Sequence, residues 1–332
     1  MKILVTGGGG FLGQAVVRLL LNGGHRVAIL NRSACSDLES LGVECLRGDL
    51  ADRETVFGAC RGRDAVIHVG ARAGPGLFRP AFERPNVVGT QNVIDSCRSH
   101  AVGFLIYTSS PSVVHSGRDL AGADESTPYP THFPAPYPAT KAEAEKRVLA
   151  ANGRSLKTTA LRPHLIWGPG DNHLLPRLVQ RNRSGRLRLP CPDKKIDTVY
   201  IDNAAEAHVL ALDNLAGSAT AAGNAYFISN GEPLAVAEIM RRLLEAAGEV
   251  PQIGRVPLGL ARAAAVIVEA TWRGLRLKSD PPVSRFMVEH LATAHWFDLS
   301  AARRDLGYWP RLSIDEGLRR LAAATEQARD HR

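Results

Sequence analysis

The residues of this chain best suited to acid–base chemistry are Tyr137 and Lys141, which stand four positions apart. Residues 141–151 have a composition typical of a helix, so both side chains would lie on one helical face, one turn apart. A phenol titrates near ~10 in solution, and a cation within ~4–6 Å favours its ionised form. The pair predicts a proton-transferring tyrosine with a pKa lowered by the lysine. The same spacing also arises by chance, so the prediction depends on the rest of the chain.

Two serines follow residues 103–108, an apolar segment that predicts a buried strand. The hydroxyl of Ser109 or Ser110, at the end of such a strand, could donate a hydrogen bond to the carbonyl oxygen of a substrate. The alternative is that the serines satisfy backbone groups of the turn, and we expect this of at least one of them.

Three glycines spaced three positions apart, Gly7, Gly10 and Gly13, lie between an expected strand at residues 2–6 and an expected helix at residues 14–21. The first glycine allows a tight turn, the second lets backbone N–H groups approach a pyrophosphate, and the third allows close packing of helix on sheet. In this strand–turn–helix context, the spacing predicts a dinucleotide site rather than a merely structural turn.

The second expected strand, residues 26–30, is followed by Asn31 and Arg32. An NAD site usually has an acidic residue here that binds the ribose 2′-hydroxyl. Asn31 has no carboxylate, and Arg32 can pair with a 2′-phosphate. The sequence therefore favours NADP. Use of NAD as well is the alternative, if Arg32 is only solvated.

Strands alternate with helices through the first half of the chain, which predicts a doubly wound parallel α/β sheet of the Rossmann type. Ligands bind such a sheet at the carboxyl ends of its strands. We expect residues 1–162 and about 198–230 to form the NADP-binding domain. Residues from about 163–197 and 231–332 would form a smaller substrate-binding lobe. The remaining expected cofactor-binding residues are Phe11, Leu12, Asp49, Leu50, Gly70, Ala71, Pro163 and Ile166.

Composition limits the other possibilities. The chain has 332 residues, a net charge of +8 and five cysteines, none in a Cys-x-x-Cys motif. This pattern predicts neither a disulfide framework nor a metal site, and it fits a cytoplasmic protein. The first strand leaves no room for a signal peptide, and no apolar run reaches the ~18–20 residues of a membrane span. The arginines of residues 177–188 lack interleaved aromatics, so we expect a solvated face and no nucleic-acid partner.

The expected substrate lobe is the least patterned part of the chain. Residues 258–277 are apolar with interspersed arginines, which predicts a helix over the substrate; a peripheral contact with the membrane surface is the alternative. His164 and His173 lie near the expected pocket, where we expect a structural role. Apolar residues bordered by Arg177 and Arg285 predict a small hydrophobic substrate with a carboxylate. These apolar residues are Leu174, Leu175, Leu178, Leu258, Leu260, Val266, Ile267 and Phe286.

Several of these motifs together resemble those of a known superfamily. The glycine-rich turn, the Tyr-Thr-Ser-Ser segment and the Tyr-Pro-Ala-Thr-Lys segment are similar to those of the extended short-chain dehydrogenases/reductases. Further segments resemble the 3β-hydroxysteroid dehydrogenase group, and within it the bacterial 2-alkyl-3-oxoalkanoate reductases of long-chain olefin biosynthesis. Residues 135–141, 148–153, 161–163 and 167–170 carry the resemblance to the group, and residues 161–177 and 225–233 carry the closer resemblance to these reductases.

The resemblance implies an NADP-dependent oxidoreductase of lipid metabolism that interconverts a 3-oxo and a 3-hydroxy group. Tyr137 would be the general acid/base, Lys141 would tune it and hold the nicotinamide ribose, and Ser110 would polarise the carbonyl. Asn86 matches a family segment in which it either supports the active-site helix or relays protons. A homodimer is the expected assembly.

The substrate stays open at this point. A 2-alkyl-3-oxoalkanoate is the first choice, and a 3β-hydroxysteroid or a 4-carboxysterol is the second. A nucleotide-sugar epimerase or dehydratase and a catalytically silent NADP-binding protein are further alternatives. Val114 and His115 stand where sugar epimerases often carry Tyr-Gly, which disfavours a nucleotide sugar.

Overall fold

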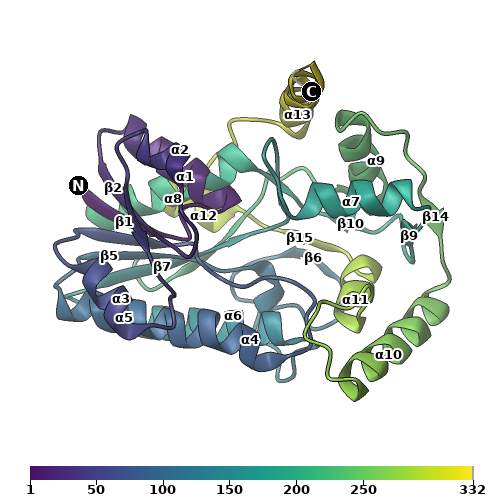
Figure 1. Cartoon of the computed structure of the whole chain (residues 1–332), viewed down its shortest axis with the longest axis horizontal. Helices are drawn as coiled ribbons and strands as arrows, with labels where there is room; N and C mark the ends of the chain where they lie inside the picture. Colours follow the sequence, from purple (N-terminus) through teal and green to yellow (C-terminus); the bar gives the residue numbers. More distant parts are fainter. Residues whose placement is uncertain (331–332) are drawn as a thin grey trace.

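The computed structural model describes residues 1–330, and its centre is a seven-stranded parallel sheet (Figure 1). The strand order is β12-β7-β5-β4-β1-β2-β3, so the connections run outward in opposite directions from β1 and β4. Doubly wound sheets bind ligands at such a switch point. The strands are β1 (Lys2–Thr6), β2 (Arg26–Asn31), β3 (Glu44–Arg47), β4 (Ala65–His68), β5 (Phe104–Thr108), β7 (Lys157–Pro163) and β12 (Ala225–Ile228).

Helices cover both faces of this sheet, and each face has its own apolar core. One face packs against α1 and α8, which also contact each other, and the opposite face packs against α3, α5 and α6. The expected α/β fold is therefore confirmed. These helices are α1 (Phe11–Asn22), α3 (Arg53–Cys60), α5 (Gly89–Ser99), α6 (Pro136–Ala150) and α8 (Ile201–Ala216), with a short α2 (Ser36–Glu39) after β2.

Two helix boundaries differ from those that the sequence suggests. A continuous helix is expected over residues 83–98, but the structure divides the segment into α4 (Arg79–Glu83), a π-helical turn η1 (Arg84–Val88) and α5. Pro85, which lacks an N–H, lies in the π turn. Asp202 is expected to cap α8, but Tyr200 occupies that position and Asp202 lies in the first turn, paired with Arg320. Asp52 is the N-cap of α3, since its side chain accepts a hydrogen bond from Glu54 N–H.

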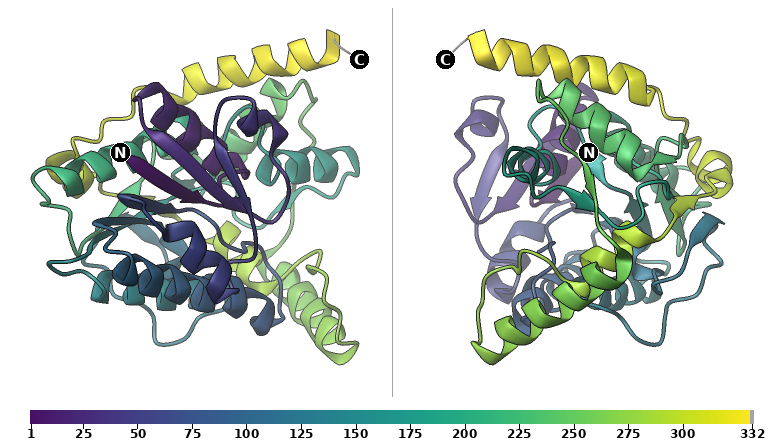
Figure 2. Two further views of the ribbon diagram at one scale, coloured as in Figure 1. Left: turned by 60° about the vertical axis from the view of Figure 1, so that its left-hand side comes forward. Right: turned by 90° about the vertical axis from the view of Figure 1, so that its right-hand side faces the viewer.

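A second group of elements lies beyond the carboxyl end of β7 (Figures 1 and 2). The largest sheet of this group has the order β13-β10-β15-β6. Helix α13 packs against α9. The remaining elements of the chain are η2 (Pro111–Val113), β6 (Leu120–Ala123), β8 (Ile166–Trp167), α7 (Leu174–Arg183), β9 (Arg188–Leu189), β10 (Lys195–Ile196), β11 (Val199–Tyr200), β13 (Leu234–Ala235), α9 (Val236–Ala246), β14 (Gly254–Arg255), α10 (Leu258–Gly274), α11 (Arg285–Ala292), β15 (His295–Phe297), α12 (Ser300–Leu306) and α13 (Ile314–Asp330). Of these, α12 lies against α8 and β12 of the large sheet.

In sequence, the elements of this second group, called here the last lobe, alternate with those of the large sheet. Strand β6 precedes α6 in the chain but pairs with β15, while β12 and α8 return to the large sheet from the later half. Among the described residues, no helix combines the length and apolar character that crossing a bilayer requires.

Candidate active site

The turn between β1 and α1 has the geometry of a dinucleotide cradle. Gly7 adopts a φ of +69°, and a Cβ added there would lie 2.7 Å from the Cα of Gly70. A Cβ on Gly13 would lie 2.1 Å from the carbonyl oxygen of Gly7, so neither position accepts a side chain. Gly10 is the N-cap of α1, whose first turn has neither a side-chain cap nor an acidic residue. The free N–H groups of this helix end suit a pyrophosphate.

The carboxyl end of β2 carries positive charge. Arg32 is exposed just beyond Asn31, whose side-chain amide donates to the Ser33 carbonyl at 3.2 Å. Strand β3 brings Arg47 opposite Asn31, and its Nε donates to the Arg32 carbonyl at 3.2 Å. Arg47 was not predicted from the sequence, because only the pairing of β2 with β3 places it here.

The other expected cofactor residues lie at the same edge of the sheet. Leu50 is fixed there, because its carbonyl accepts from Asn92 at 2.9 Å and its side chain lies against Gly70. Asp49 accepts the backbone N–H of Ala51 at 2.9 Å. Placed around them are Phe11 and Leu12 at the start of α1, Ala71 after β4, Pro163 at the end of β7 and Ile166 at the start of β8.

Tyr137 lies in the first turn of α6, and its phenol is within reach of Ser110. Burial raises the pKa of Tyr137 above its usual value, and the hydrogen bond from Ser110 opposes this effect. Ser110 caps η2: its Oγ accepts the Ser112 N–H at 3.2 Å and lies 2.9 Å from the Ser112 hydroxyl. Ser109 is different, since it is buried and its N–H donates to the Leu161 carbonyl at 2.5 Å.

Lys141 is buried one turn further along α6. Its Nζ donates to the carbonyl oxygen of Thr108 at 2.5 Å and lies 4.1 Å from the centre of the Tyr107 ring. Burial lowers the pKa of Lys141 to about 7, against the opposing effect of the Glu145 carboxylate. The structure differs here from the expectation that Lys141 lowers the pKa of Tyr137. The ammonium is directed at Thr108, and burial dominates at the phenol.

A buried ion pair supports α6 from the next turn. Glu145 and Arg162 are 0% and 3% exposed, and their closest N–O distance is 2.6 Å. The Tyr129 hydroxyl also donates to the Glu145 carboxylate at 2.6 Å. This group was missed from sequence, although the charged residue four positions after Lys141 is a signal that could have found it.

Asn86, in the π turn, ties the loop after β4 to α6. Its amide donates to the Thr140 hydroxyl and to the Arg72 carbonyl, both at 3.0 Å, and its oxygen accepts the Arg72 N–H at 2.7 Å. These contacts favour the supporting role. Behind it, His68 bonds to the hydroxyls of Thr6 at 2.6 Å and Thr90 at 3.0 Å. Burial lowers the pKa of His68 to about 3, so this ring is neutral.

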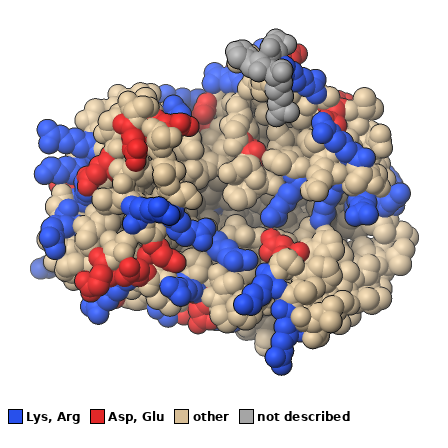
Figure 3. Space-filling model, in the orientation of Figure 1, with Lys and Arg blue, Asp and Glu red and all other residues tan. Residues whose placement is uncertain are grey.

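The expected apolar pocket is only partly assembled. Leu260, Val266 and Ile267 are 62%, 51% and 66% exposed on the outer face of α10, so including them in the pocket was wrong. The surface over α10, at the lower right of Figure 3, carries few charged residues. Leu178 is buried, and the others, Leu174, Leu175, Leu258 and Phe286, are half-buried.

The two arginines expected to bind a carboxylate already have acidic partners. The Nε of Arg285 donates to the carboxylate of the buried Glu269 at 2.9 Å, and the Arg285 backbone N–H donates to the same carboxylate. Arg177 lies 3.5 Å from Asp280. The basic run is solvated as expected: Lys and Arg gather over α7 in Figure 3, and four of its five arginines are exposed. His173 is exposed just before α7.

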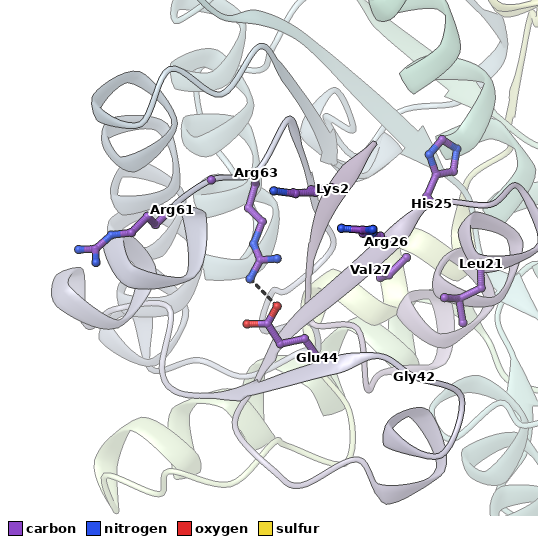
Figure 4. A pocket seen from close by; sticks show the side chains of 10 residues that line it. Lys2, Leu21, His25, Arg26, Val27, Gly42, Glu44, Arg61 and Arg63 are labelled. Atoms are coloured by element: carbon purple, nitrogen blue, oxygen red, sulfur yellow. Dashed lines mark hydrogen bonds and ion pairs between the residues drawn. The ribbon is translucent and has the colours of Figure 1, made fainter.

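A hollow of about 640 Å³ lies elsewhere, at the amino ends of the strands (Figure 4). It is lined by the first residues of three strands, Lys2, Arg26 and Glu44, and by Arg63, which pairs with Glu44 at 2.8 Å. The predicted catalytic residues lie at the opposite, carboxyl edge of the sheet, so this hollow is not the candidate site.

A family profile decides the identity of the chain. The profile of the 3-beta hydroxysteroid dehydrogenase/isomerase family matches residues 4–258. The chain belongs to this family. Members of the 3-beta hydroxysteroid dehydrogenase/isomerase family are oxidoreductases that act on CH–OH groups, so the chain is an NAD(P)-dependent dehydrogenase/reductase.

Named relatives of the 3-beta hydroxysteroid dehydrogenase/isomerase family cover nearly the whole chain. A 2-alkyl-3-oxoalkanoate reductase of Stenotrophomonas maltophilia is 53% identical over 98% of this chain and 99% of its own length. A protein of the same name from Shewanella oneidensis is 45% identical over 96% and 85%. A 3-beta-hydroxysteroid dehydrogenase of Mycolicibacterium neoaurum is 33% identical over 96% and 89%.

Solved structures place this family member in the extended short-chain dehydrogenase/reductase fold. The UDP-glucose 4-epimerase of Thermus thermophilus, in complex with NAD, superposes with a TM-score of 0.75 at 26% identity. The match covers 99% of this chain and 100% of the epimerase. A UDP-glucose 4-epimerase from Thermotoga maritima, 20% identical, shares the fold with a TM-score of 0.77 over 99% of both chains.

Proposed function

We propose that the enzyme reduces a 2-alkyl-3-oxoalkanoate to the 2-alkyl-3-hydroxyalkanoate with NADPH, and catalyses the reverse oxidation through the same residues. The observation that carries this proposal is the 53% identity, over almost the full length of both chains, with a 2-alkyl-3-oxoalkanoate reductase. The juxtaposition of Ser110 and Tyr137 at the carboxyl edge of the sheet supports it.

In the proposed reaction the substrate carbonyl is held between the two hydroxyls. The Ser110 hydroxyl donates a hydrogen bond to the C3 oxygen, and Tyr137 donates the proton that this oxygen needs when it becomes an alkoxide. Because burial raises the pKa of Tyr137, the phenol keeps its proton near neutral pH, which suits a proton donor for reduction. Bound NADPH supplies the hydride.

Lys141 has two tasks in this proposal. Its Nζ holds the Thr108 carbonyl at the end of β5 and thereby the loop that carries Ser110. With a pKa of about 7, Lys141 can also move a proton near neutral pH, and through the ribose hydroxyls it would resupply Tyr137.

Preference for NADP over NAD rests on the charges at the end of β2. Arg32 is exposed, no acidic side chain follows β2 directly, and the Arg47 side chain is held beside Arg32 because its Nε donates to the Arg32 carbonyl. Two guanidinium groups suit a 2′-phosphate, since arginine binds phosphate oxygens in pairs.

A sterol substrate is the second candidate, favoured by the 33% identity with a 3-beta-hydroxysteroid dehydrogenase. The candidates are separated by measuring turnover, as the change in nicotinamide absorbance, on a panel of substrates. The panel contains 2-alkyl-3-oxo acids of increasing chain length, a 3-hydroxysterol and a nucleotide sugar. Each buried methylene adds ~0.8 kcal/mol, so efficiency should rise steeply with alkyl length. Equal rates along the series, or faster turnover of the sterol, would contradict the fatty-acid substrate. The homodimer and the peripheral membrane contact stay predictions.

A further inference from the structure

Four histidines that are distant in sequence meet where the last lobe joins the large sheet. His164 follows β7, His115 follows η2, His290 lies on α11 and His295 lies on β15. The ring centroids of neighbouring members are 4.1–6.1 Å apart. His164, His295 and His115 are 3%, 2% and 2% exposed, and His290 is half-buried. The proposed reaction uses none of these rings.

From this cluster, the geometry points to a binding site for one divalent transition-metal ion of the zinc type, with His164, His290 and His295 as ligands. One ring nitrogen of each of the three lies within 4.8 Å of those of the other two. Ligand nitrogens about 2.0–2.1 Å from a tetrahedral ion are roughly 3.3 Å apart. Side-chain rotations of small amplitude are therefore sufficient to close the site.

The hydrogen bonds of His295 leave a lone pair on the nitrogen that faces the cluster. Its Nε2 lies 2.7 Å from the His290 carbonyl, which can only accept, so the Nε2 carries the proton and the Nδ1 carries the lone pair. This Nδ1 accepts a hydrogen bond from the Nε2 of His164 at 2.6 Å, and a metal ion between the two rings would replace that hydrogen bond, with the His164 proton on its Nδ1 instead. A ligating histidine whose other ring N–H donates to a backbone carbonyl is the usual arrangement around protein-bound metals.

Two further ring nitrogens are buried without a hydrogen-bond partner among the described residues, the Nδ1 of His290 and the Nδ1 of His115. The Thr293 hydroxyl donates to the Glu289 carbonyl at 2.8 Å, so it accepts from His115 Nε2, and His115 Nδ1 keeps a lone pair. Buried nitrogens without partners are rare and require an explanation. A metal ion supplies one for His290, and His115 offers a further donor beside the site.

The charge state of the cluster suits a metal. Burial lowers the pKa of His295 to about 4 and also lowers the pKa of His164 and His290, so the rings are neutral near neutral pH. Neutral imidazole is the form that binds zinc, copper, nickel or iron. An ion here would join α11 and β15 to His164, which directly follows β7 of the large sheet. Its role would be to hold the substrate lobe against the sheet.

The test uses the full chain without a histidine tag. The metal content is measured by elemental analysis after incubation with zinc and gel filtration, and thermal unfolding is followed with zinc and with a chelator. We expect about one zinc ion per chain, and a Tm that rises with zinc concentration because the ion binds only the folded state. Cobalt substitution should give the visible absorption of a tetrahedral site.

Matched variants decide whether the histidines are the ligands. His290→Gln and His164→Gln should each lose the zinc and the zinc-dependent rise in Tm. His208→Gln removes another fully buried histidine, bonded to Thr108 and Ala204, and should keep both. Wild-type protein without stoichiometric zinc, or zinc bound equally by His290→Gln, would overturn the proposal. If His164→Gln does not fold, the half-buried His290 alone decides.

Discussion

Helices α6 and α10 are of similar length, and each departs from the usual distribution of side chains. Helix α6 buries charged residues, whereas α10 exposes apolar ones. Helix α6 buries two charged residues, Lys141 and Glu145, at 2% and 0% exposure. Helix α10 leaves Leu260 and Ile267 more than 60% exposed, and only Ala265 and Glu269 are buried along it. Charged residues are seldom fully buried unless paired, and clustered exposed apolar residues mark contact surfaces. The difference teaches that the buried charges of α6 find partners within the chain, whereas the apolar side chains of α10 stay exposed on its surface.

The sharpest test of α6 removes its transferable proton. Tyr137→Phe deletes one hydroxyl from the first turn and leaves the packing of the ring in place. Turnover should fall ~10²–10⁴-fold, the usual contribution of a positioned acid/base group, while cofactor affinity is retained. Steady-state oxidation of NADPH measures the loss. Tyr226→Phe, which removes a hydroxyl that contacts Asp305 on α12, is the matched control. Near wild-type turnover of Tyr137→Phe would exclude this residue.

The second test breaks the internal pairing of α6. Glu145→Ala leaves the Arg162 guanidinium buried without its carboxylate, and loss of one partner of a buried pair costs about 3–5 kcal/mol of unfolding free energy. The control is Glu238→Ala, which removes the half-exposed partner of Arg241 and should cost about 0–1 kcal/mol. Urea unfolding measures both variants. Equal losses of unfolding free energy in the two variants would show that the buried pair on α6 contributes no more than an exposed one.

The third test concerns the cofactor edge. Arg32→Asp should weaken NADPH binding about 10–100-fold, because a charge-assisted hydrogen bond contributes about 1.5–3 kcal/mol, and should favour NADH. Arg47→Ala should produce a smaller loss in the same direction. Fluorescence titration with both nucleotides gives the affinities. Unchanged affinities in Arg32→Asp would place recognition of the 2′-phosphate at another residue.

The fourth test uses pH. Burial lowers the folded-state pKa of Lys141 from 10.5 to about 7, so between these values the unfolded chain binds a proton that the folded chain does not. This contribution to stability therefore grows as pH rises from about 7 and is lost as pH falls back, on the order of 1 kcal/mol per pH unit. Lys141→Met should flatten the dependence between pH 7 and 9 in urea unfolding. An unchanged slope would refute the assignment.

The smallest effect is expected on α10. Ile267→Asp should change the unfolding free energy by no more than about 0.5 kcal/mol, because the side chain is 66% exposed. Ala265→Asp, two residues away and fully buried, should destabilise by several times as much. If α10 contacts lipid, co-sedimentation of Ile267→Asp with anionic vesicles should fall below that of the wild type. A large loss of stability in Ile267→Asp would mean that this face is covered.

Local signals were sufficient for the edge of the sheet that holds the cofactor turn. The turn at Gly7 and the spacing of Tyr137 and Lys141 depend on neighbours in sequence, so pattern and propensity predict them. The pKa of Tyr137 was different, because burial by residues distant in sequence outweighs the nearby cation.

Long-range pairing accounts for most of what the sequence did not reveal. Arg47 reaches Arg32 only through the β2–β3 pair, and the four histidines meet only when α11 and β15 dock. The outward face of α10 was assigned to the pocket, since an apolar helix gives no indication of which side it buries. These contacts depend on the tertiary fold, which a periodicity in one segment does not encode.

The pairing of β6 with β15 has a consequence for synthesis. Asp119, beside β6, bonds to Ala294, beside β15, and the two residues are 175 positions apart. At ~5–20 residues per second, a ribosome would need roughly 10–35 s to deliver the partner strand. During that interval β6 lacks β15, the strand that it pairs with in the sheet, and unpaired strand edges promote association between nascent chains. We therefore expect chaperone capacity to affect the yield of active enzyme strongly. It should have little effect on the stability of the folded enzyme.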